Sequence, residues 1–283
     1  MLDALKLMRI PFSIFLMPVY WFALSQIPSI EPLRAIHVFI LLHIFVYPAS
    51  NGYNSYFDKD EKSIGGLKNP PPVNPSLYPL VLLFDFISVA YAFWISPLFA
   101  VFIFGYLIVS KAYSYDKIRL KKYPVLSTLV VTIFQGFYLF LSIQFAVYLE
   151  WEFILEFNNL ALAACSSLFL LGSYPLTQVY QHQEDRERGD RTLSLLLGIK
   201  ETFYFSAIAF LLGSLTIAYL FIEQGSVNDL YIFLGFGLPI LAYFSYWFSL
   251  VIKNPNRANF KYSMRMNMIS SLCLSGAFLV MLV

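Results

Sequence analysis

The chain has 283 residues, of which 59% are hydrophobic and only 13% are charged. Because soluble domains carry about 25% charged residues, this composition excludes an ordinary soluble protein and favours one that is embedded in a lipid bilayer. The formal net charge of +2 is small, and we expect no nucleic-acid partner.

Nine predominantly apolar segments are interpreted as membrane-spanning helices, each of which needs about 20 such residues. They cover roughly residues 11–27, 35–57, 77–95, 97–112, 124–148, 159–183, 202–222, 230–251 and 266–283. The first segment lacks a small-residue cleavage site, so we interpret it as a retained span and not as a signal peptide. The sequence predicts an all-α, polytopic membrane protein with nine transmembrane helices and a single membrane-embedded domain over residues 1–283.

The basic residues are distributed on one side of the predicted spans. Eighteen of the nineteen Lys and Arg residues lie before the first span, in alternate gaps or, for Lys111, at the end of the fourth span on the same side, and only Arg34 lies in a gap on the other side. Cytoplasmic loops of membrane proteins carry such an excess of Lys and Arg. We therefore predict an integral membrane protein, in the inner membrane if the cell is bacterial, with a cytoplasmic N-terminus and an external C-terminus.

A first acidic cluster closes the second span. If the helix continues through it, Asn54, Asp58 and Glu61 share one face, because residues four and seven apart lie above one another. Asp60 points away from that face unless the helix has already unwound. Such oxygen ligands suit a hard cation such as Mg²⁺, which typically binds one or two carboxylates together with substrate phosphates. Lys68 follows a Gly-Gly turn and is a candidate phosphate contact.

A second acidic cluster follows the sixth span. One helical face there would carry Gln181, Glu184, Asp185 and Arg188. Nearby, Arg186 and Arg191 can supply forked donors to a phosphate, and acids beside arginines suit a metal–diphosphate complex better than a bare cation. A charged loop at a membrane surface is ordinarily only solvated, but two acidic clusters on the same side favour a shared site on the cytoplasmic side.

These residues resemble the aspartate-rich motifs of the UbiA superfamily of intramembrane prenyltransferases. Asn54 and Asp58 match the first motif, and the run from Asp185 to Leu193 is similar to the second motif of the menaquinone-type branch. The segment from Tyr113 through Lys121 is similar to the Tyr/Lys loop of the family, and Arg9-x-Pro11 to its N-terminal Arg-Pro.

The resemblance implies a helical bundle of nine spans, Mg²⁺ as cofactor and an isoprenoid diphosphate as substrate. It implies catalytic roles for Asp58 and Asp185. The implied metal ligands come from Asn54, Asp58, Asp60, Glu61, Glu184 and Asp185, and the implied diphosphate contacts from Lys68, Lys117, Arg119, Arg186 and Arg191. Further candidates for the same site are Asn51, Tyr115, Tyr180 and Gln181.

The sequence departs from the family pattern in both motifs. Lys62 replaces the last aspartate of the first motif, whereas Thr177 and Gln181 stand where Asn and Asp are expected in the second. Each motif thus lacks one charged ligand. Glu61 and Glu184 are the substitutes that the sequence offers.

Other polar residues lie within or beside the spans. Asp85 is an acid inside the third span, where a charge is costly and indicates either a functional role or a hydrogen bond to a neighbouring helix. His182 is interpreted as an exposed residue at the edge of the second cluster, and His37 and His43 as packed or hydrogen-bonded residues. Pro48 and Pro175 are expected to kink the two acid-bearing helices.

We predict a prenyltransferase that moves an isoprenoid chain from a polyprenyl diphosphate to an aromatic or other small polar acceptor. The alternative on the same scaffold is a UbiA-type terpene cyclase, in which the cation closes on its own chain. A further alternative is a transporter or non-catalytic membrane protein. A transporter would usually bind its substrate near the bilayer midplane, where only Asp85 is suitably placed.

Overall fold

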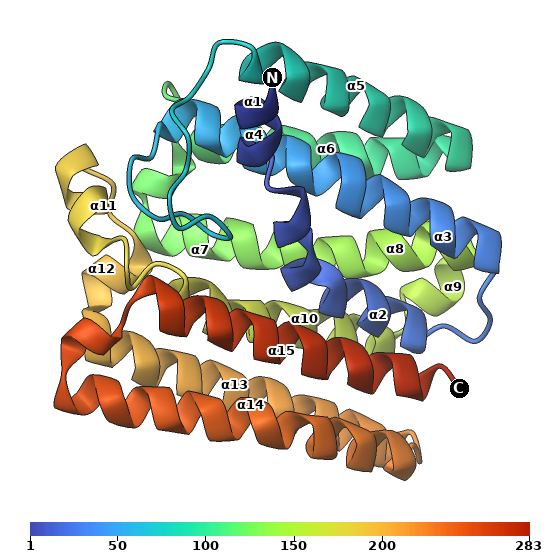
Figure 1. Cartoon of the computed structure of the whole chain (residues 1–283). Helices are drawn as coiled ribbons and strands as arrows, with labels where there is room; N and C mark the ends of the chain where they lie inside the picture. The colour runs from blue at the N-terminus through green and yellow to red at the C-terminus, as the bar shows by residue number, and fades with distance from the viewer.

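The computed structural model describes residues 1–283 as an all-helical bundle with nine helices that are long and apolar enough to cross a membrane. They run back and forth along one direction, and the short helices α11 and α12 cover one end of the bundle (Figure 1). This end also carries the loop 59–76, and we call it the charged end. The predicted fold class and the number of spans are confirmed.

Three of the nine spans are built from more than one segment, and six are continuous helices. The composite spans are α1 (Leu2–Leu7) with η1 (Ile10–Leu16) and α2 (Met17–Ser25); α3 (Pro32–Ile40) with η2 (Leu41–Val46) and α4 (Tyr47–Asp58); and α7 (Pro124–Thr132) with η4 (Ile133–Tyr138) and α8 (Leu139–Tyr148). The continuous ones are α5 (Leu77–Ile95), α6 (Pro97–Ser114), α10 (Phe157–Leu176), α13 (Ile199–Glu223), α14 (Val227–Lys253) and α15 (Phe260–Met281).

Short helices connect the spans. They are η3 (Leu120–Lys122), α9 (Trp151–Ile154), α11 (His182–Arg188), α12 (Leu193–Leu197) and η5 (Pro255–Arg257). Proline begins several elements, as in α3, α6 and α7, because its missing N–H costs nothing in the first helical turn. All of these short helices except α9 lie between spans at the charged end.

The first span bends where Arg9 adopts a left-handed backbone with φ of 51°. The helix begins near residue 2, earlier than the sequence predicts, and continues as a 3-10 segment with Pro11 in its first turn. This break separates α1 from the rest of the span, and it places the Arg9 side chain against α4.

The second and fifth spans each contain a π-helical segment, η2 and η4. Insertions of this kind occur often at functional sites, since they widen a helix locally and redirect its side chains. In η4, Gly136 faces the backbone of Ser167 on α10, and an added Cβ would lie only 2.7 Å from the Ser167 nitrogen. Glycine is therefore required for this close approach of the fifth and sixth spans.

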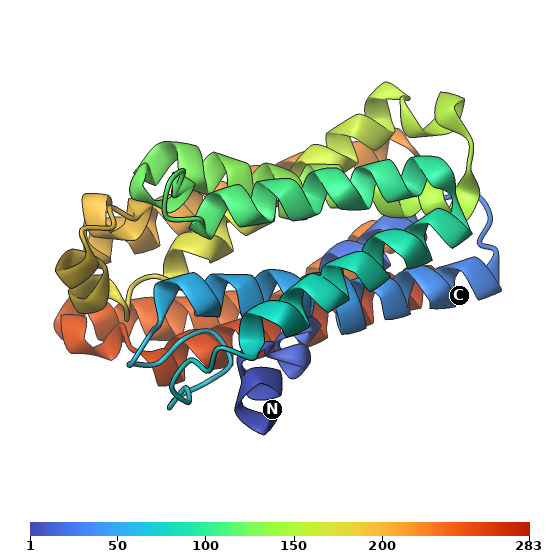
Figure 2. The same ribbon diagram turned by 90° about the horizontal axis from the view of Figure 1, so that it is seen from above.

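The sixth span ends earlier than the sequence predicts. α10 ends at Leu176, directly after Pro175, although the sixth span was predicted to continue to residue 183. The residues after it form turns, and the second acidic cluster lies on the separate helix α11. The chain then turns away from the bundle axis, and α11, in dark yellow in Figure 2, lies across the end of the bundle.

The intramembrane acid Asp85 pairs with a base. Its carboxylate lies 2.7 Å from the Lys111 ammonium of α6. That ammonium also lies over the Tyr53 ring of α4, 4.9 Å from the ring centre. The pair satisfies two charges that would otherwise be costly in the membrane. Asp85 does not line the large cavity described below, so the structure supports the hydrogen-bonding interpretation.

Candidate active site

A cavity of about 280 Å³ opens inside the charged end of the bundle. Its walls come from η1, α4, α6, the fifth span, α10 and α11, together with the loop after α4. The charged residues among its lining are Arg9, Asp58, Asp60, Lys121, Asp185 and Arg188. Both acidic clusters thus contribute to one cavity, as the sequence predicts.

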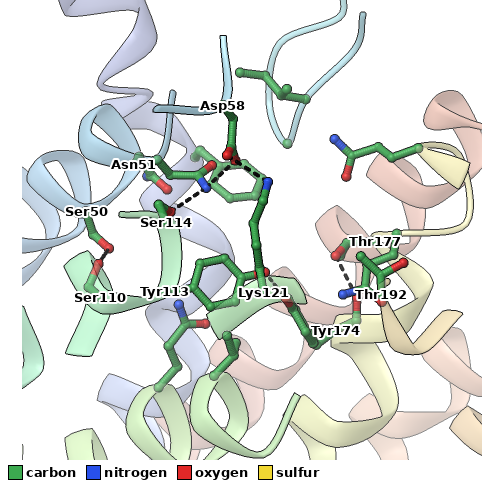
Figure 3. Close-up of a pocket in the computed structure, with 18 of the residues that line it drawn as sticks. Ser50, Asn51, Asp58, Ser110, Tyr113, Ser114, Lys121, Tyr174, Thr177 and Thr192 are labelled. Atoms are coloured by element: carbon green, nitrogen blue, oxygen red, sulfur yellow. Dashed lines mark hydrogen bonds and ion pairs between the residues drawn. The ribbon is translucent and has the colours of Figure 1, made fainter. Parts of the chain in front are cut away.

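Helix α4 places the first cluster on the cavity wall. The amide of Asn54 donates to Asp58 on the next turn at 2.6 Å and to the Ser114 hydroxyl of α6 at 2.9 Å. Figure 3 labels Asp58 and Ser114 and marks these interactions with dashed lines. Asn54 also accepts a hydrogen bond from Arg9 at 3.4 Å. These contacts hold the Asp58 carboxylate at the mouth of the cavity, where it is 8% exposed.

The helix does not continue to Glu61. It ends at Asp58, because Lys59 adopts a left-handed backbone with φ of 50°, and the chain then unwinds. As a result Asp60 enters the cavity, whereas Glu61 is exposed and does not line it. Asp60 was expected to face the site only if the helix had already unwound before it, and α4 does end before Asp60.

A buried ion-pair network joins the loop after α6 to both clusters. Lys121 contacts Asp58 at 2.7 Å and Asp190 at 3.0 Å. Arg119 forms two parallel hydrogen bonds of 2.9 Å with Asp190 and approaches Asp58 at 3.4 Å. Burial opposes the charge on Lys121, but Asp58 and Asp190 raise its pKa above the usual value, so the ammonium remains protonated.

Asp190 is the anion at the centre of this network and is only 1% exposed. Burial acts to raise its pKa, but the hydrogen bonds and charges of Arg119 and Lys121 hold the pKa below the usual value. An ionised Asp190 thus fixes the two basic side chains that precede α7. The forked geometry is the strong form of an arginine–carboxylate contact.

A second network surrounds Arg188 on α11. Its guanidinium donates to Asp60 and, at 2.9 Å, to Glu184 one turn earlier. Glu184 also accepts from the backbone N–H of Glu61 at 3.2 Å. These bonds fasten α11 to the loop after α4, so that the two acidic clusters close over the cavity together.

Asp185 faces the cavity without a basic partner in contact. Its carboxylate accepts a hydrogen bond from Thr192 at 3.1 Å. Burial raises its pKa to about 7, with smaller increases from Asp190 and Asp60 and opposing effects from Lys121 and Thr192. Of the three cavity-lining acids, Asp185 is therefore the one that a proton or a cation can most readily occupy.

The structure places the predicted site residues in different positions relative to the cavity. Seven line the cavity, namely Asn51, Asn54, Asp58, Asp60, Tyr180, Gln181 and Asp185. Arg119 and Glu184 are buried behind the lining and hold residues that form it. Tyr115 packs against Phe57, and Glu61, Lys68, Lys117, Arg186 and Arg191 are exposed and outside the lining. His182 is hydrogen-bonded to Ser194 at 2.8 Å and also lies outside the lining.

Three residues of the site were not among the predicted ligands. Lys121 lies in a run of four basic residues between positions 117 and 122, and spacing alone does not show which of them points inward. Arg188 was placed on the correct helical face but given no role, and Asp190 lies beyond the end of α11. Only the loop geometry brings Lys121 and Asp190 together.

The donor set of the cavity suits a hard cation. Carboxylates of Asp58, Asp60 and Asp185 and the amides of Asn51 and Asn54 line the same space. No three acidic or histidine side chains lie close enough to form a metal centre from protein ligands alone. This arrangement fits Mg²⁺, which usually keeps one or two carboxylate ligands and takes others from substrate phosphates and water.

Comparison with known structures supports the fold. A UbiA homologue from Archaeoglobus fulgidus bound to GPP and Mg²⁺ superimposes with a TM-score of 0.71 at 17% identity, over 99% of both chains. A UbiA homologue from Aeropyrum pernix K1 gives 0.69 at 18% identity, over 97% of this chain and 99% of that chain. A digeranylgeranylglyceryl phosphate synthase gives 0.62 at 19% identity, over 98% of this chain and 96% of that chain.

At these identities the structural likeness concerns the fold. No curated protein sequence matches the chain. The sequence does match the UbiA prenyltransferase family over residues 15–269, a range that contains both acidic clusters and the loop with Lys121. The chain therefore belongs to the UbiA prenyltransferase family and is an intramembrane prenyltransferase.

Proposed function

We propose that the enzyme binds an isoprenoid diphosphate with its diphosphate at the charged end of the cavity and transfers the isoprenoid chain to an acceptor bound deeper in the same cavity. The observation that carries the proposal is the convergence of Lys121 and Arg188 with three acids, Asp58, Asp60 and Asp185, on one cavity at the end of the bundle. Arginine and lysine donors suit phosphate oxygens, while the acids suit the accompanying cation.

The ion pairs of the site prepare the donors for a diphosphate. Lys121 is held by Asp58 and Asp190, and Arg188 by Asp60 and Glu184. Because each base is already oriented toward the cavity by a buried acid, little side-chain entropy remains to be lost when a phosphate oxygen replaces one of these contacts. Arg119 supports Lys121 from behind, through Asp190.

Asp58, Asp60 and Asp185 would hold Mg²⁺, with Asn51 and Asn54 as neutral oxygen donors. When bound, the ion supplies electrostatic stabilisation of the diphosphate as negative charge develops on it. The allylic C–O bond breaks with its electron pair going to the diphosphate, and Lys121 and Arg188 stabilise that leaving group. The acceptor then donates an electron pair to the allylic carbon and loses a proton.

Tyrosines from α6 and α10 lie next to the reacting end. The hydroxyls of Tyr113 and Tyr174 are hydrogen-bonded to each other below Lys121 (Figure 3). Their rings, with that of Tyr106 earlier on α6, line the cavity. Aromatic faces stabilise a cation and exclude water from it, and such a wall suits an allylic cation that must survive until the acceptor reacts.

The orientation of the site follows from the charge distribution. All the loops that build the charged end lie on the side with eighteen Lys and Arg residues, which favours a cytoplasmic diphosphate site. A soluble diphosphate product would then be released to the cytoplasm.

The experiment that tests the proposal uses the purified full chain with geranyl diphosphate, with and without Mg²⁺. We expect geranyl diphosphate to bind in the presence of Mg²⁺ only. Pyrophosphate should then be released slowly, because without an added acceptor water captures the allylic cation and gives geraniol. Asp58→Asn should abolish pyrophosphate release, whereas Asp3→Asn, which removes an exposed carboxylate of α1, should not. Absence of diphosphate binding contradicts the proposal, and a cyclic hydrocarbon formed without acceptor supports the terpene cyclase instead.

A further inference from the structure

Four polar side chains line the cavity at a deeper level than the acids. They are Ser50 on α4, Tyr106 and Ser110 on α6, and Gln135 on η4. Ser50 precedes Asp58 by eight residues on the same span, which places it about 12 Å further into the membrane at 1.5 Å per residue. A diphosphate bound at the charged end is therefore too far away to form hydrogen bonds with these four side chains.

The four side chains form one group. The hydroxyls of Ser50 and Ser110 are hydrogen-bonded to each other across α4 and α6, as Figure 3 shows. The side chains of Gln135 and Ser50 lie beside the Tyr106 hydroxyl. Gln135 lies in the π-helical segment of the fifth span, where the widened turn brings its amide to the cavity. We call this group the inner polar group.

An isoprenoid chain alone does not explain the inner polar group. Polar groups that face an apolar ligand remain without partners, at a cost of about 1–3 kcal/mol each. The Gln135 amide has two N–H donors and a carbonyl, more than the Tyr106 hydroxyl can satisfy. Apolar lining is available elsewhere for the chain, on η1, where Phe12, Phe15 and Leu16 face the same cavity.

The inner polar group also lacks a cation. The basic residues that line the cavity are Arg9, Lys121 and Arg188. Lys121 and Arg188 belong to the charged end. The terminal nitrogens of Arg9 donate to the carbonyl oxygens of Asn51 and Gly65 and to the side chain of Asn54, which holds this guanidinium beside the first acidic cluster, with its Nε unpaired. A carboxylate at this depth would be a charge without a partner, and such a charge is strongly disfavoured in a membrane interior.

We infer that the inner polar group is the acceptor subsite and that it takes an uncharged acceptor bearing hydroxyl or carbonyl groups, which hydrogen-bond to Gln135, Ser50 and Ser110. The body of the acceptor packs against Tyr106 and Phe134, which line the same part of the cavity. This inference rests on the proposed function, because an acceptor is needed only if the enzyme transfers the chain.

The test compares two probes that share a shape and differ in charge, 4-hydroxybenzamide and 4-hydroxybenzoate. Their binding to the purified full chain is measured by calorimetry, with geranyl diphosphate and Mg²⁺ titrated separately. We expect the neutral amide to bind at least about tenfold more tightly than the carboxylate. Gln135→Leu should weaken amide binding by about tenfold, the effect of losing roughly 1.4 kcal/mol, while geranyl diphosphate binds as in the wild type.

A matched control is Gln224→Leu, the same change at an exposed residue after α13 at the other end of the bundle. It should leave both affinities unchanged. Equal or tighter binding of the carboxylate, binding of neither probe, or undiminished amide binding in Gln135→Leu overturns the inference while geranyl diphosphate still binds. Loss of geranyl diphosphate binding in the wild type instead contradicts the proposed function, so the two failures are distinguishable.

Discussion

The ammonium of Lys121 lies 2.7 Å from the carboxylate of Asp58. This contact joins the loop before the fifth span to the end of α4. Both side chains are nearly buried, with 7% and 8% of their residue surface exposed, so neither can reorient freely in water. Under the proposed function, Lys121 therefore lies where the diphosphate meets the first acidic cluster.

Replacing Lys121 by Met should lower kcat/KM for geranyl diphosphate by about ten- to a hundredfold, which corresponds to roughly 1.4–2.7 kcal/mol. The change removes a phosphate donor and leaves Asp58 and Asp190 with less positive charge nearby. Lys122→Met is the matched control, because Lys122 is exposed on the next position, and its kinetics should remain close to those of the wild type. Equal losses in both variants would show that the loop charge, and not this contact, is what matters.

The two acids that follow α4 should differ in importance. Asp60→Asn should reduce turnover, because Asp60 faces the cavity and pairs with Arg188. Glu61→Gln should change it little, because the Glu61 side chain is exposed and only its backbone N–H contacts Glu184. Steady-state kinetics of the two single variants measure the difference in turnover. A larger loss of turnover in Glu61→Gln than in Asp60→Asn would show that Glu61 is the ligand that replaces the missing aspartate of the first motif.

Much of this architecture could be predicted from the sequence, since apolar length fixes the spans and the Asn54–Asp58 spacing fixes one helix face. The role of Asp60 could not be settled, because it depends on the left-handed turn at Lys59, a position where nothing in the residue type demands that the helix end. Likewise, the inward direction of Lys121 depends on the turn at Arg119, with φ of 43°, and on Asp190, which is distant in sequence. Such contacts are tertiary and leave no periodic pattern.

Metal affinity should depend on pH through Asp185. Burial raises the pKa of this carboxyl to about 7, so near neutral pH about half of the metal-free molecules carry a proton there. A proton and Mg²⁺ compete for the same oxygens, and the apparent affinity for Mg²⁺ should therefore rise as the pH increases from about 6 to about 8.

The measurement is a Mg²⁺ titration of pyrophosphate release at each pH. Chelation with EDTA should stop release, and added Mg²⁺ should restore it. Asp185→Asn should weaken Mg²⁺ binding and remove this pH dependence. A steep pH dependence that persists unchanged in Asp185→Asn would assign the titration to another group.

A buried amide pair at the end opposite the acids should contribute to stability. Gln144 on α8 and Asn159 on α10 exchange hydrogen bonds of 2.9 and 2.8 Å, and Gln144 also donates to the carbonyl of Ala23 at 3.2 Å. Gln144→Leu leaves the amide of Asn159 partly unpaired and should lower the free energy of unfolding by about 1–3 kcal/mol. Thermal unfolding in detergent measures the loss, and the double variant with Asn159→Leu should recover part of it.

The predicted orientation can be tested with single cysteines in a background where Cys165 and Cys273 are replaced by serine. Lys62→Cys and Arg186→Cys lie at the charged end and Glu152→Cys lies at the opposite end, and all three positions are exposed in the structure. If eighteen basic residues keep the charged end in the cytoplasm, an impermeant maleimide added to intact cells should label only position 152. Positions 62 and 186 should react after the membrane is opened. Labelling of position 62 in intact cells would reverse the orientation of the diphosphate site.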